Sequence, residues 1–324
     1  MKFRKVSIVV WRMMESSPIL VAVQCLVFNH EPYLRQCLDG FVMQKTNFRF
    51  VVIVHDDCST DGSASIIREY AEKYPNLFHV IIQPQNLYSR GISPTREYIN
   101  PIIEQLKPKY ISLCEGDDYW TDPYKLQKQV DFLESHPEYS MCFSNAKVIG
   151  GTNEEVHMYD SLQDRDYQAI DILKKWTIPT CTILYRRGVR LVPNKSIVFG
   201  DIYLFLQLAQ QGKVRCQNEE MACYRRHPGS ASSIKSNEEM LKLYMRFVKQ
   251  YEYMAKFFAA INEVSEECRN VAINNCNYVI YDNSSLLYDR FICIYRRARL
   301  RGDSMKSFCS FVYTYVIKPY LHLK

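Results

Sequence analysis

Three carboxylates lie within four residues of one another in the segment 114–120 (CEGDDYW), at Glu115, Asp117 and Asp118. This segment directly follows the apolar run 110–113, which predicts a buried strand. Carboxylates this close repel one another unless a positive group lies among them. Because the end of a buried strand has no structural use for three acids, the spacing predicts a bound cation at this point of the chain.

Two further polar clusters follow apolar runs of the kind that form buried strands. The residues 29–31 (NHE) follow the run 19–28, and the residues 56–62 (DDCSTDG) follow the run 50–55. A loop from a strand to a helix needs only one capping residue, so acids at three strand ends indicate a ligand site. Capping of the next helix explains the residues 59–61 equally well, but it does not explain Asp56 and Asp57.

The donor set favours Mg²⁺ or Mn²⁺, because carboxylate oxygens without nearby Cys or His suit hard divalent ions better than they suit zinc. Such ions keep positions open for substrate phosphates, so the clusters predict a nucleoside diphosphate or triphosphate as ligand. The sequence has no GxxxxGK or GxGxxG segment, so a glycine loop does not hold the phosphates. Arg90 and Arg96 are candidates to hold them, and a solvated helix face explains both residues equally well.

Alternating strands and helices must position these clusters. The apolar runs predict strands at 19–28, 50–55, 79–83 and 110–114, and the spacing between them predicts helices at 32–44 and about 63–74. This alternation predicts an α/β fold with a mainly parallel sheet covered by helices on both faces. Ligands of such sheets bind beyond the carboxyl ends of the strands, where the three clusters fall.

The composition is that of an ordinary globular protein, with 324 residues, 47% of them hydrophobic and 23% charged. This length allows one large core, or one domain with a smaller appendage. The twelve cysteines form no CxxC pair and have no regular spacing, and we expect no cleavable signal peptide. These features predict reduced thiols in a cytoplasmic protein rather than a disulfide framework or a zinc site.

Positive charge is concentrated at the two ends of the chain. The residues 286–324 hold eight Lys and Arg against two Asp, and the net charge of the whole chain is +6. Both ends contain apolar stretches shorter than the roughly 20 residues that cross a bilayer. Two explanations stay open: basic aromatic ends that lie on the inner face of the cell membrane, or a C-terminal helix packed on the core. Nucleic acid is not an expected partner, because no binding motif accompanies the basic residues.

The motifs taken in order are similar to those of glycosyltransferase family 2. The resemblance rests on FNH at 28–30, VHDDCSTDGS, PQNLYSRG and YISLCEGDDYW, and it runs from about 19 to 233. It implies an inverting sugar transferase with a GT-A, Rossmann-like fold that uses Mn²⁺ or Mg²⁺. In this family the segment 115–117 takes the place of a DxD motif, and here Glu replaces its first Asp.

The resemblance also assigns roles to individual residues. Asp57 recognises the nucleotide base with Asp56 beside it, Asp117 holds the metal, and Glu115 lies nearer the ribose. The loop 224–232 (YRRHPGSAS) closes over the diphosphate, with His227 as a further metal ligand. The other residues that we expect to bind the nucleotide-sugar are Asn29, Asn86, Arg90, Arg96, Asp118, Arg225 and Arg226.

The second half of the sequence supplies a candidate general base. The segment 199–212 (FGDIYLFLQLAQQG) has apolar residues at helical spacing, Asp201 at its start and Gly212 as the expected C-cap. Capping alone explains an Asp at this place, but its position matches the catalytic acid of the family. We expect the segment 176–187 (WTIPTCTILYRR) to line the acceptor pocket.

The implied reaction moves a sugar, with inversion, from a nucleotide-sugar to an acceptor hydroxyl, with Asp201 as the base. UDP-hexoses are the commonest donors in the family, and the expected acceptor is a glycan or a lipid-linked oligosaccharide of a bacterial surface polysaccharide. A nucleotidyltransferase would need a glycine- and lysine-rich loop after the first strand, which FNHEPYLRQ does not offer. A non-catalytic relative that only binds sugar nucleotides would lack Asp201.

The expected domains are an N-terminal extension at 1–18, a GT-A domain at 19–235 and a helical region at 236–324. The aromatic residues Tyr244, Phe247 and Tyr251 follow helical spacing in the last region. Such spacing is typical of a core-facing stripe rather than of a sugar-binding platform.

Overall fold

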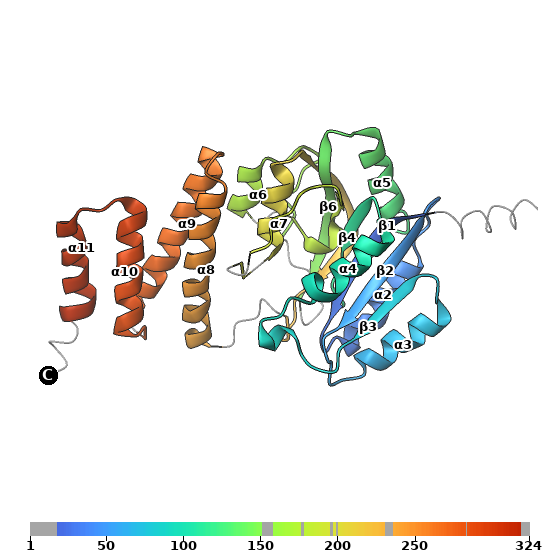
Figure 1. Ribbon diagram of the computed structural model, residues 1–324, viewed down its shortest axis with the longest axis horizontal. Coiled ribbons are helices and arrows are strands. Elements are labelled where there is room, and N and C mark those ends of the chain that lie inside the picture. Colours follow the sequence, from blue (N-terminus) through green and yellow to red (C-terminus); the bar gives the residue numbers. More distant parts are fainter. Residues whose placement is uncertain are drawn as a thin grey trace, which may run out of the picture. The chain divides into compact units, whose positions relative to one another are not determined.

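The computed structural model describes residues 18–150, 158–175, 178–194, 197–198, 200–230, 236–282 and 284–318. The chain divides into two compact units (Figure 1). The first comprises residues up to Gln168 together with Thr177–Arg190 and Gln207–His227. The second comprises Ala169–Trp176, Leu191–Leu206 and the chain from Pro228 onward. The domain boundaries expected from the sequence stay a prediction, and the expected N-terminal extension, apart from Pro18, lies outside the described residues.

Four parallel strands form one half of the sheet in the first unit, in the order β3-β2-β1-β4. Their bounds are β1 Ile19–Val27, β2 Arg49–Asp56, β3 Phe78–Ile82 and β4 Tyr110–Leu113. The connecting helices are α2 Glu31–Val42, α3 Ser63–Lys73 and α4 Asn100–Leu106. The strands and helices predicted from the sequence are confirmed, with bounds that differ by at most two residues.

The other half of the sheet is mixed. It continues from β4 through β7 (Leu184–Arg186), β6 (Tyr139–Ile149) and β8 (Lys213–Arg225) to β5 (Tyr119–Trp120). The pairs β4–β7, β6–β7 and β5–β8 are antiparallel, whereas β6 and β8 run parallel. This curled, eight-stranded sheet with its helices is a GT-A fold, which confirms the predicted fold class. The remaining helical segments of the unit are η1 Tyr88–Arg90, η2 Thr95–Ile99, α5 Lys125–Ser135 and η3 Thr180–Thr182.

The core of the first unit explains why β1 is a nearly continuous apolar run. Val21, Ala22, Val23 and Cys25 are fully buried, as expected for a central parallel strand that is covered on both faces. Helix α2 presents a complementary stripe to this core, with Leu34, Cys37, Leu38 and Phe41 fully buried at helical spacing. The first turn of α2 and the carboxyl end of β1 are therefore fixed in place by packing on either side.

Gly212 has a different role from the predicted helix C-cap. Helix α7 (Gly200–Ala209) ends three residues earlier, and Gly212 is not among the glycines of the described chain with positive φ. A Cβ atom at this position would lie 2.7 Å from the backbone nitrogen of Ser140 and 3.0 Å from the backbone oxygen of Glu138. Glycine is required here because two backbones approach closely, not because a helix ends in a left-handed residue.

The second unit is helical in its described part. It contains α6 (Ala169–Lys175) and the start of α7. The consecutive helices α8 Asn237–Phe257, α9 Asn262–Tyr281, α10 Leu287–Arg301 and α11 Met305–Val312 follow (Figure 1), and the π-helical segment η4 Tyr313–Ile317 comes after them. Its core comprises Val248, Cys276, Val279, Ile280, Cys293 and Ile294. Tyr251 is buried and Tyr244 packs against this core, as predicted, while Phe247 is half-buried and lies beside Tyr251.

The end of the described chain also packs on this core. Phe308, Phe311 and Val312 of α11 lie against the buried cluster, while Met305, Tyr313 and Ile317 are exposed. This arrangement matches the packed-helix explanation of the basic C-terminal region. No helix in the described part of the chain combines the length and the apolar character that a bilayer-spanning segment requires.

Candidate active site

Hydrogen bonds join the loops that follow β1 and β2. The backbone N–H of Asn29 donates to Ser59 Oγ at 2.9 Å, and Asn29 Oδ1 accepts the N–H of Thr60 at 2.8 Å. Asn29 adopts a left-handed conformation with φ 56°, which asparagine tolerates better than most residues. The predicted nucleotide-binding residue Asn29 therefore turns the chain at the end of β1 and fixes the next loop.

The first turn of α2 and the loop that leads into α3 are linked reciprocally. Asp61 Oδ2 accepts the N–H of Glu31 at 3.0 Å, and Glu31 Oε2 accepts the N–H of Gly62 at 2.7 Å. Asp61 Oδ1 also accepts the N–H of Ser63, and the N–H of His30 donates to Ser63 Oγ. The N-cap of α3 is Gly62 rather than one of the residues 59–61, but Asp61 still satisfies one free backbone donor at the start of each of the two helices.

Asp57 organises the loop after β3. Its two carboxylate oxygens accept the N–H groups of Leu87 at 2.8 Å and Tyr88 at 3.0 Å. The side-chain amide of Asn86 donates to the backbone oxygen of Asp57 at 3.2 Å. Asp56 is buried beside it and accepts the N–H of Ser59, while its Oδ1 has no hydrogen-bond partner among the described residues. Asp56, Asp57 and Asn86 therefore lie together at the ends of β2 and β3.

The described contacts of Arg90 and Arg96 are with residues of their own segments. Arg90 pairs with Gln85, and Arg96 Nε donates to Glu97 Oε1 at 2.9 Å. Both arginines are exposed, and the described contacts include none between either of them and the acids at 115–118. Their expected role as phosphate ligands stays a prediction.

The three acids after β4 have different environments. Glu115 is exposed, whereas Asp117 and Asp118 are 9% and 2% exposed. Asp118 Oδ1 accepts the backbone N–H of Arg225 at 2.8 Å. Burial, and after it the charge of Asp117, raises the pKa of Asp118 well above its ordinary value. Repulsion within the cluster is therefore partly relieved by the fold itself, and Glu115 and Asp117 are the acids best placed to face a ligand.

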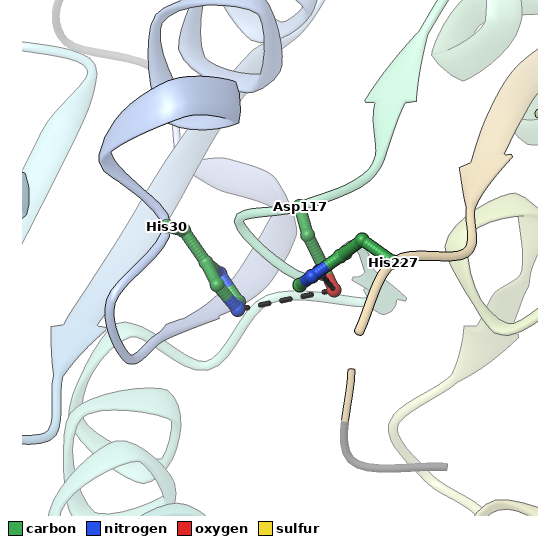
Figure 2. A group of neighbouring side chains, drawn as sticks. All are labelled: His30, Asp117 and His227. Atoms are coloured by element: carbon green, nitrogen blue, oxygen red, sulfur yellow. Dashed lines mark hydrogen bonds and ion pairs between the residues drawn. The ribbon is translucent and has the colours of Figure 1, made fainter. Parts of the chain in front are cut away.

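Two histidines flank Asp117, one from the end of β1 and one from just beyond β8. His30 Nε2 lies 3.8 Å and His227 Nε2 lies 3.1 Å from Asp117 Oδ2. Figure 2 shows the three side chains turned toward one another. One ligand atom from each of these residues lies within 4.8 Å of the other two, and so do single oxygens of Glu115, Asp117 and Asp118. Burial lowers the pKa of His30, which favours the neutral imidazole that ligates metals.

These side chains fit a divalent cation. Asp117 Oδ1 is buried and has no hydrogen-bond partner in the described chain, so one of its oxygens is available to a ligand. The nearby nitrogens of His30 and His227 make the donor set mixed, contrary to the expectation of carboxylates without nearby histidine. His30 is the residue that the sequence reasoning missed, although it lies within the polar cluster at 29–31.

The side chain of Arg225 fixes the position of Asp117. Its Nε donates to the backbone oxygen of Asp117 at 3.0 Å, and its Nη2 donates to Gln36 Oε1 at 2.8 Å. The guanidinium carbon lies 4.6 Å from the ring centroid of Tyr33, which in turn is 4.7 Å from the ring of His227. Arg225 is therefore engaged in positioning Asp117 and His227, while its predicted neighbour Arg226 is exposed.

Asp201 belongs to the second unit and lies in the first turn of α7. Its Oδ1 accepts the backbone N–H of Ile202 at 2.8 Å, so it satisfies one of the free donors of the helix start. Burial raises the pKa of Asp201 above the ordinary value for an aspartic acid. Its expected role as the base stays a prediction.

The segment that we expected to line an acceptor pocket is part of the core. Cys181, Ile183 and Leu184 are at most 1% exposed, and the indole N–H of Trp120 donates to the backbone oxygen of Cys181 at 2.8 Å. Side chains this well buried do not line an open pocket, so the prediction was wrong for this part of the segment. Its apolar residues support the strand end that carries the acids.

The eight-stranded sheet with its helices is the GT-A fold, and the acidic cluster lies at the strand ends of this fold. A family model described as Glycosyl transferase family 2 matches residues 25–190, which is more than half of the chain. The chain therefore belongs to this family, as the motifs predicted.

Two relatives and one solved structure illustrate the similarity. The uncharacterized protein Rv1520 of Mycobacterium tuberculosis is 37% identical over 210 residues, which cover 64% of this chain and 59% of that protein. TuaG of Bacillus subtilis, named for teichuronic acid biosynthesis, is 29% identical over 223 residues, which cover 67% of this chain and 82% of TuaG. The structure of S. aureus TarS 1–349 with UDP-GlcNAc has a TM-score of 0.59 and 17% identity, and the match covers 91% and 87% of the two chains.

The match to Rv1520 leaves about two fifths of that relative uncovered, because the aligned part spans 59% of its length. The likeness to TarS, at 17% identity, concerns the fold.

Proposed function

We propose that this chain transfers a sugar from a UDP-linked donor to a hydroxyl of a glycan or lipid-linked acceptor, with inversion and with the help of a divalent metal. The observation that carries the proposal is the grouping of Asp117 with His227, His30 and Glu115 at the strand ends of a family 2 fold. The UDP-GlcNAc complex of S. aureus TarS supports a UDP-linked donor, and the name of TuaG supports a surface polymer as acceptor.

Asp117 and His227 are the residues that would hold the metal. Bound there, a divalent cation supplies positive charge to the diphosphate as it leaves the sugar. The mixed nitrogen and oxygen donors favour Mn²⁺ over Mg²⁺, because imidazole suits transition metals better than it suits magnesium. Arg225 hydrogen-bonds to the backbone of Asp117 and stacks on Tyr33, and Tyr33 packs against His227. These contacts keep Asp117 and His227 in place before the donor binds.

The remaining residues of the strand-end loops shape the donor site. Asp57 and Asn86 hold the loop after β3 in a fixed conformation, and this loop is then ready to meet the nucleotide base. Glu115 is exposed and is assigned to the ribose, while Asp118 is buried beside Asp117. The positive side chains assigned to the diphosphate are the exposed ones, Arg90, Arg96 and Arg226.

Asp201 acts as the general base in this proposal. A carboxylate whose pKa is raised by burial is a stronger proton acceptor than an exposed aspartate, which suits removal of a proton from a sugar hydroxyl. The deprotonated oxygen attacks the anomeric carbon from the side opposite the diphosphate. The C–O bond to the diphosphate breaks as the new glycosidic bond forms, so a single displacement inverts the configuration.

The location that fits this activity is the inner face of the cell membrane, where lipid-linked acceptors are assembled. The exposed apolar residues Met305, Tyr313 and Ile317 lie beside basic residues such as Lys306 and Lys318. Apolar and basic side chains on one short helical segment are typical of contact with anionic lipid headgroups.

A donor screen with Asp201→Asn as the comparison tests the proposal. Wild type is incubated with Mn²⁺ and each of several UDP- and GDP-sugars, and released UDP or GDP and the anomeric configuration of the product are measured. The variant keeps a side-chain oxygen that can cap α7, so it should fold and bind donor normally while transfer falls by about 10²–10⁴-fold. Transfer at the wild-type rate by Asp201→Asn would remove Asp201 from the mechanism. Retention of the donor's anomeric configuration would contradict the single displacement.

A further inference from the structure

His30 lies in the candidate site without a hydrogen bond to Asp117. The 3.8 Å between His30 Nε2 and Asp117 Oδ2 exceeds hydrogen-bond distance, whereas the 3.1 Å from His227 Nε2 to the same oxygen does not. Ligands of an octahedral ion with bonds of about 2.1 Å are about 3.0 Å apart when adjacent and about 4.2 Å apart when opposite. The 3.1 Å separation matches adjacent ligands, and the 3.8 Å separation lies between the two ideal values. One ligand atom from each of the three residues lies within 4.8 Å of the other two, so the three side chains are close enough to share one ion (Figure 2).

The fold holds the His30 imidazole in this position through its backbone and through the shape of the neighbouring loop. The backbone N–H of His30 donates to Ser63 Oγ at 3.0 Å, and its carbonyl accepts the N–H groups of Tyr33 and Leu34. A Cβ atom on Gly116 would lie 2.8 Å from His30 Nδ1. The glycine in the middle of the Glu-Gly-Asp segment therefore leaves the space that the imidazole occupies.

Packing alone does not explain a histidine at this place. Its Nδ1 atom is buried and has no hydrogen-bond partner among the described residues, which is unfavourable for a polar atom. An apolar side chain of similar size would fill the same space without that cost. Nε2 faces Asp117, so a metal bond at this nitrogen would add favourable free energy that offsets the cost of the buried Nδ1, which itself stays without a partner among the described residues.

We propose that His30 is a third protein ligand of the metal, so that two imidazoles and one carboxylate hold the ion and make the site select Mn²⁺ over Mg²⁺. This inference rests on the proposed function, since it concerns the same metal. Three protein ligands would leave coordination positions of the ion for diphosphate oxygens. The preference for Mn²⁺ would then depend on His30, which follows β1 and is far in sequence from the acids at 115–118.

The test counts the nitrogens bound to manganese. Full-length protein is loaded with Mn²⁺ and UDP, and pulsed electron paramagnetic resonance measures the ¹⁴N couplings of coordinated imidazole. We expect two coupled nitrogens in the wild type and one in His30→Gln, with Mn²⁺ binding weakened by about 10-fold or more and Mg²⁺ binding changed less. His79→Gln is the matched control, because His79 is exposed on β3 and should leave both couplings in place.

The outcomes separate this inference from the proposed function. A single coupled nitrogen in the wild type, unchanged in His30→Gln, overturns the inference and leaves the metal on Asp117 and His227. Weaker UDP binding by His30→Gln with both couplings intact also overturns it, because His30 would then contact the phosphates directly. Failure of the wild type to bind Mn²⁺ at all, with UDP present, overturns the inference and the metal dependence of the proposed function together.

Discussion

Replacing Lys125 with methionine should stabilise the first unit at neutral pH. Lys125 is fully buried, its Nζ donates to Gln129 Oε1 at 2.9 Å, and it lies 4.2 Å from the ring centroid of Trp120. Burial lowers the pKa of Lys125 from 10.5 to about 8, because the surrounding core gives the ammonium less stabilisation than water does. Methionine fills a similar volume and carries no charge to desolvate.

The size and sign of the expected change in stability follow from the lowered pKa of Lys125. A fall of about 2.5 pKa units corresponds to about 3 kcal/mol of unfolding free energy. Below pH 8 both the folded and the unfolded lysine are protonated, so the full penalty is present. Between pH 8 and 10.5 the unfolded state binds more protons than the folded state, so the wild type gains stability as pH rises. At pH 7, Lys125→Met should gain about 1–3 kcal/mol after the lost hydrogen bond and cation–π contact are subtracted.

Urea unfolding followed by the fluorescence of Trp120 measures this difference. Trp11 and Trp176 are changed to phenylalanine in both proteins, so that Trp120 reports alone. Burial raises the pKa of the neighbouring thiols Cys114 and Cys142 to about 11 and about 12, so they do not titrate between pH 7 and 9.5. The difference in unfolding free energy between variant and wild type should narrow from pH 7.5 to 9.5. A gap that stays constant over this range would refute the assignment of the penalty to the Lys125 charge.

Three further outcomes are expected. Asp117→Ala should abolish Mn²⁺-dependent binding of UDP in calorimetry, because the ion loses its central oxygen ligand, and unchanged affinity would show that no metal binds there. Gly116→Ala should weaken Mn²⁺ binding with every ligand retained, because the new Cβ would meet the imidazole of His30; Gly188→Ala, with open space around it, is the control in the same titration. The exposed apolar residues of the C-terminal region are Met305, Tyr313 and Ile317. Changing them to serine should abolish binding to anionic vesicles, measured by sedimentation at low salt. Wild-type protein that does not sediment with the vesicles would refute the membrane contact.

The parallel half of the sheet could be predicted because each of its strands and helices is determined by residues that are neighbours in the sequence. The runs that form β1 to β4 are short, apolar and separated by helical spacing, so each element is recognisable without its partners. The strands β6 and β8 have no such signature, since polar residues interrupt both and their pairing contains register shifts. Which segments pair, and whether they run parallel, depends on contacts between residues distant in sequence.

The candidate site was predictable for its acids and less so for its histidines. Asp117 stands in a recognisable motif, whereas His30 is the middle one of three polar residues at 29–31, any of which could face a ligand. The left-handed turn at Asn29 and the space above Gly116 decide that the imidazole turns toward Asp117, and neither is visible in the sequence pattern. The engagement of Arg225 by a backbone carbonyl is likewise a property of the folded chain.

The distribution of the cysteines makes the chain ready for distance measurements. Ten of the twelve thiols are buried, and Cys58 and Cys309 are the two that solvent reaches. Thiols in apolar surroundings carry little thiolate and react slowly, so a maleimide spin label should attach first at these two natural positions. One lies in the loop after β2 and the other on α11, so each of the two units carries one label. Dipolar spectroscopy on the unaltered sequence would therefore record whether the spacing of the units changes when donor and acceptor bind.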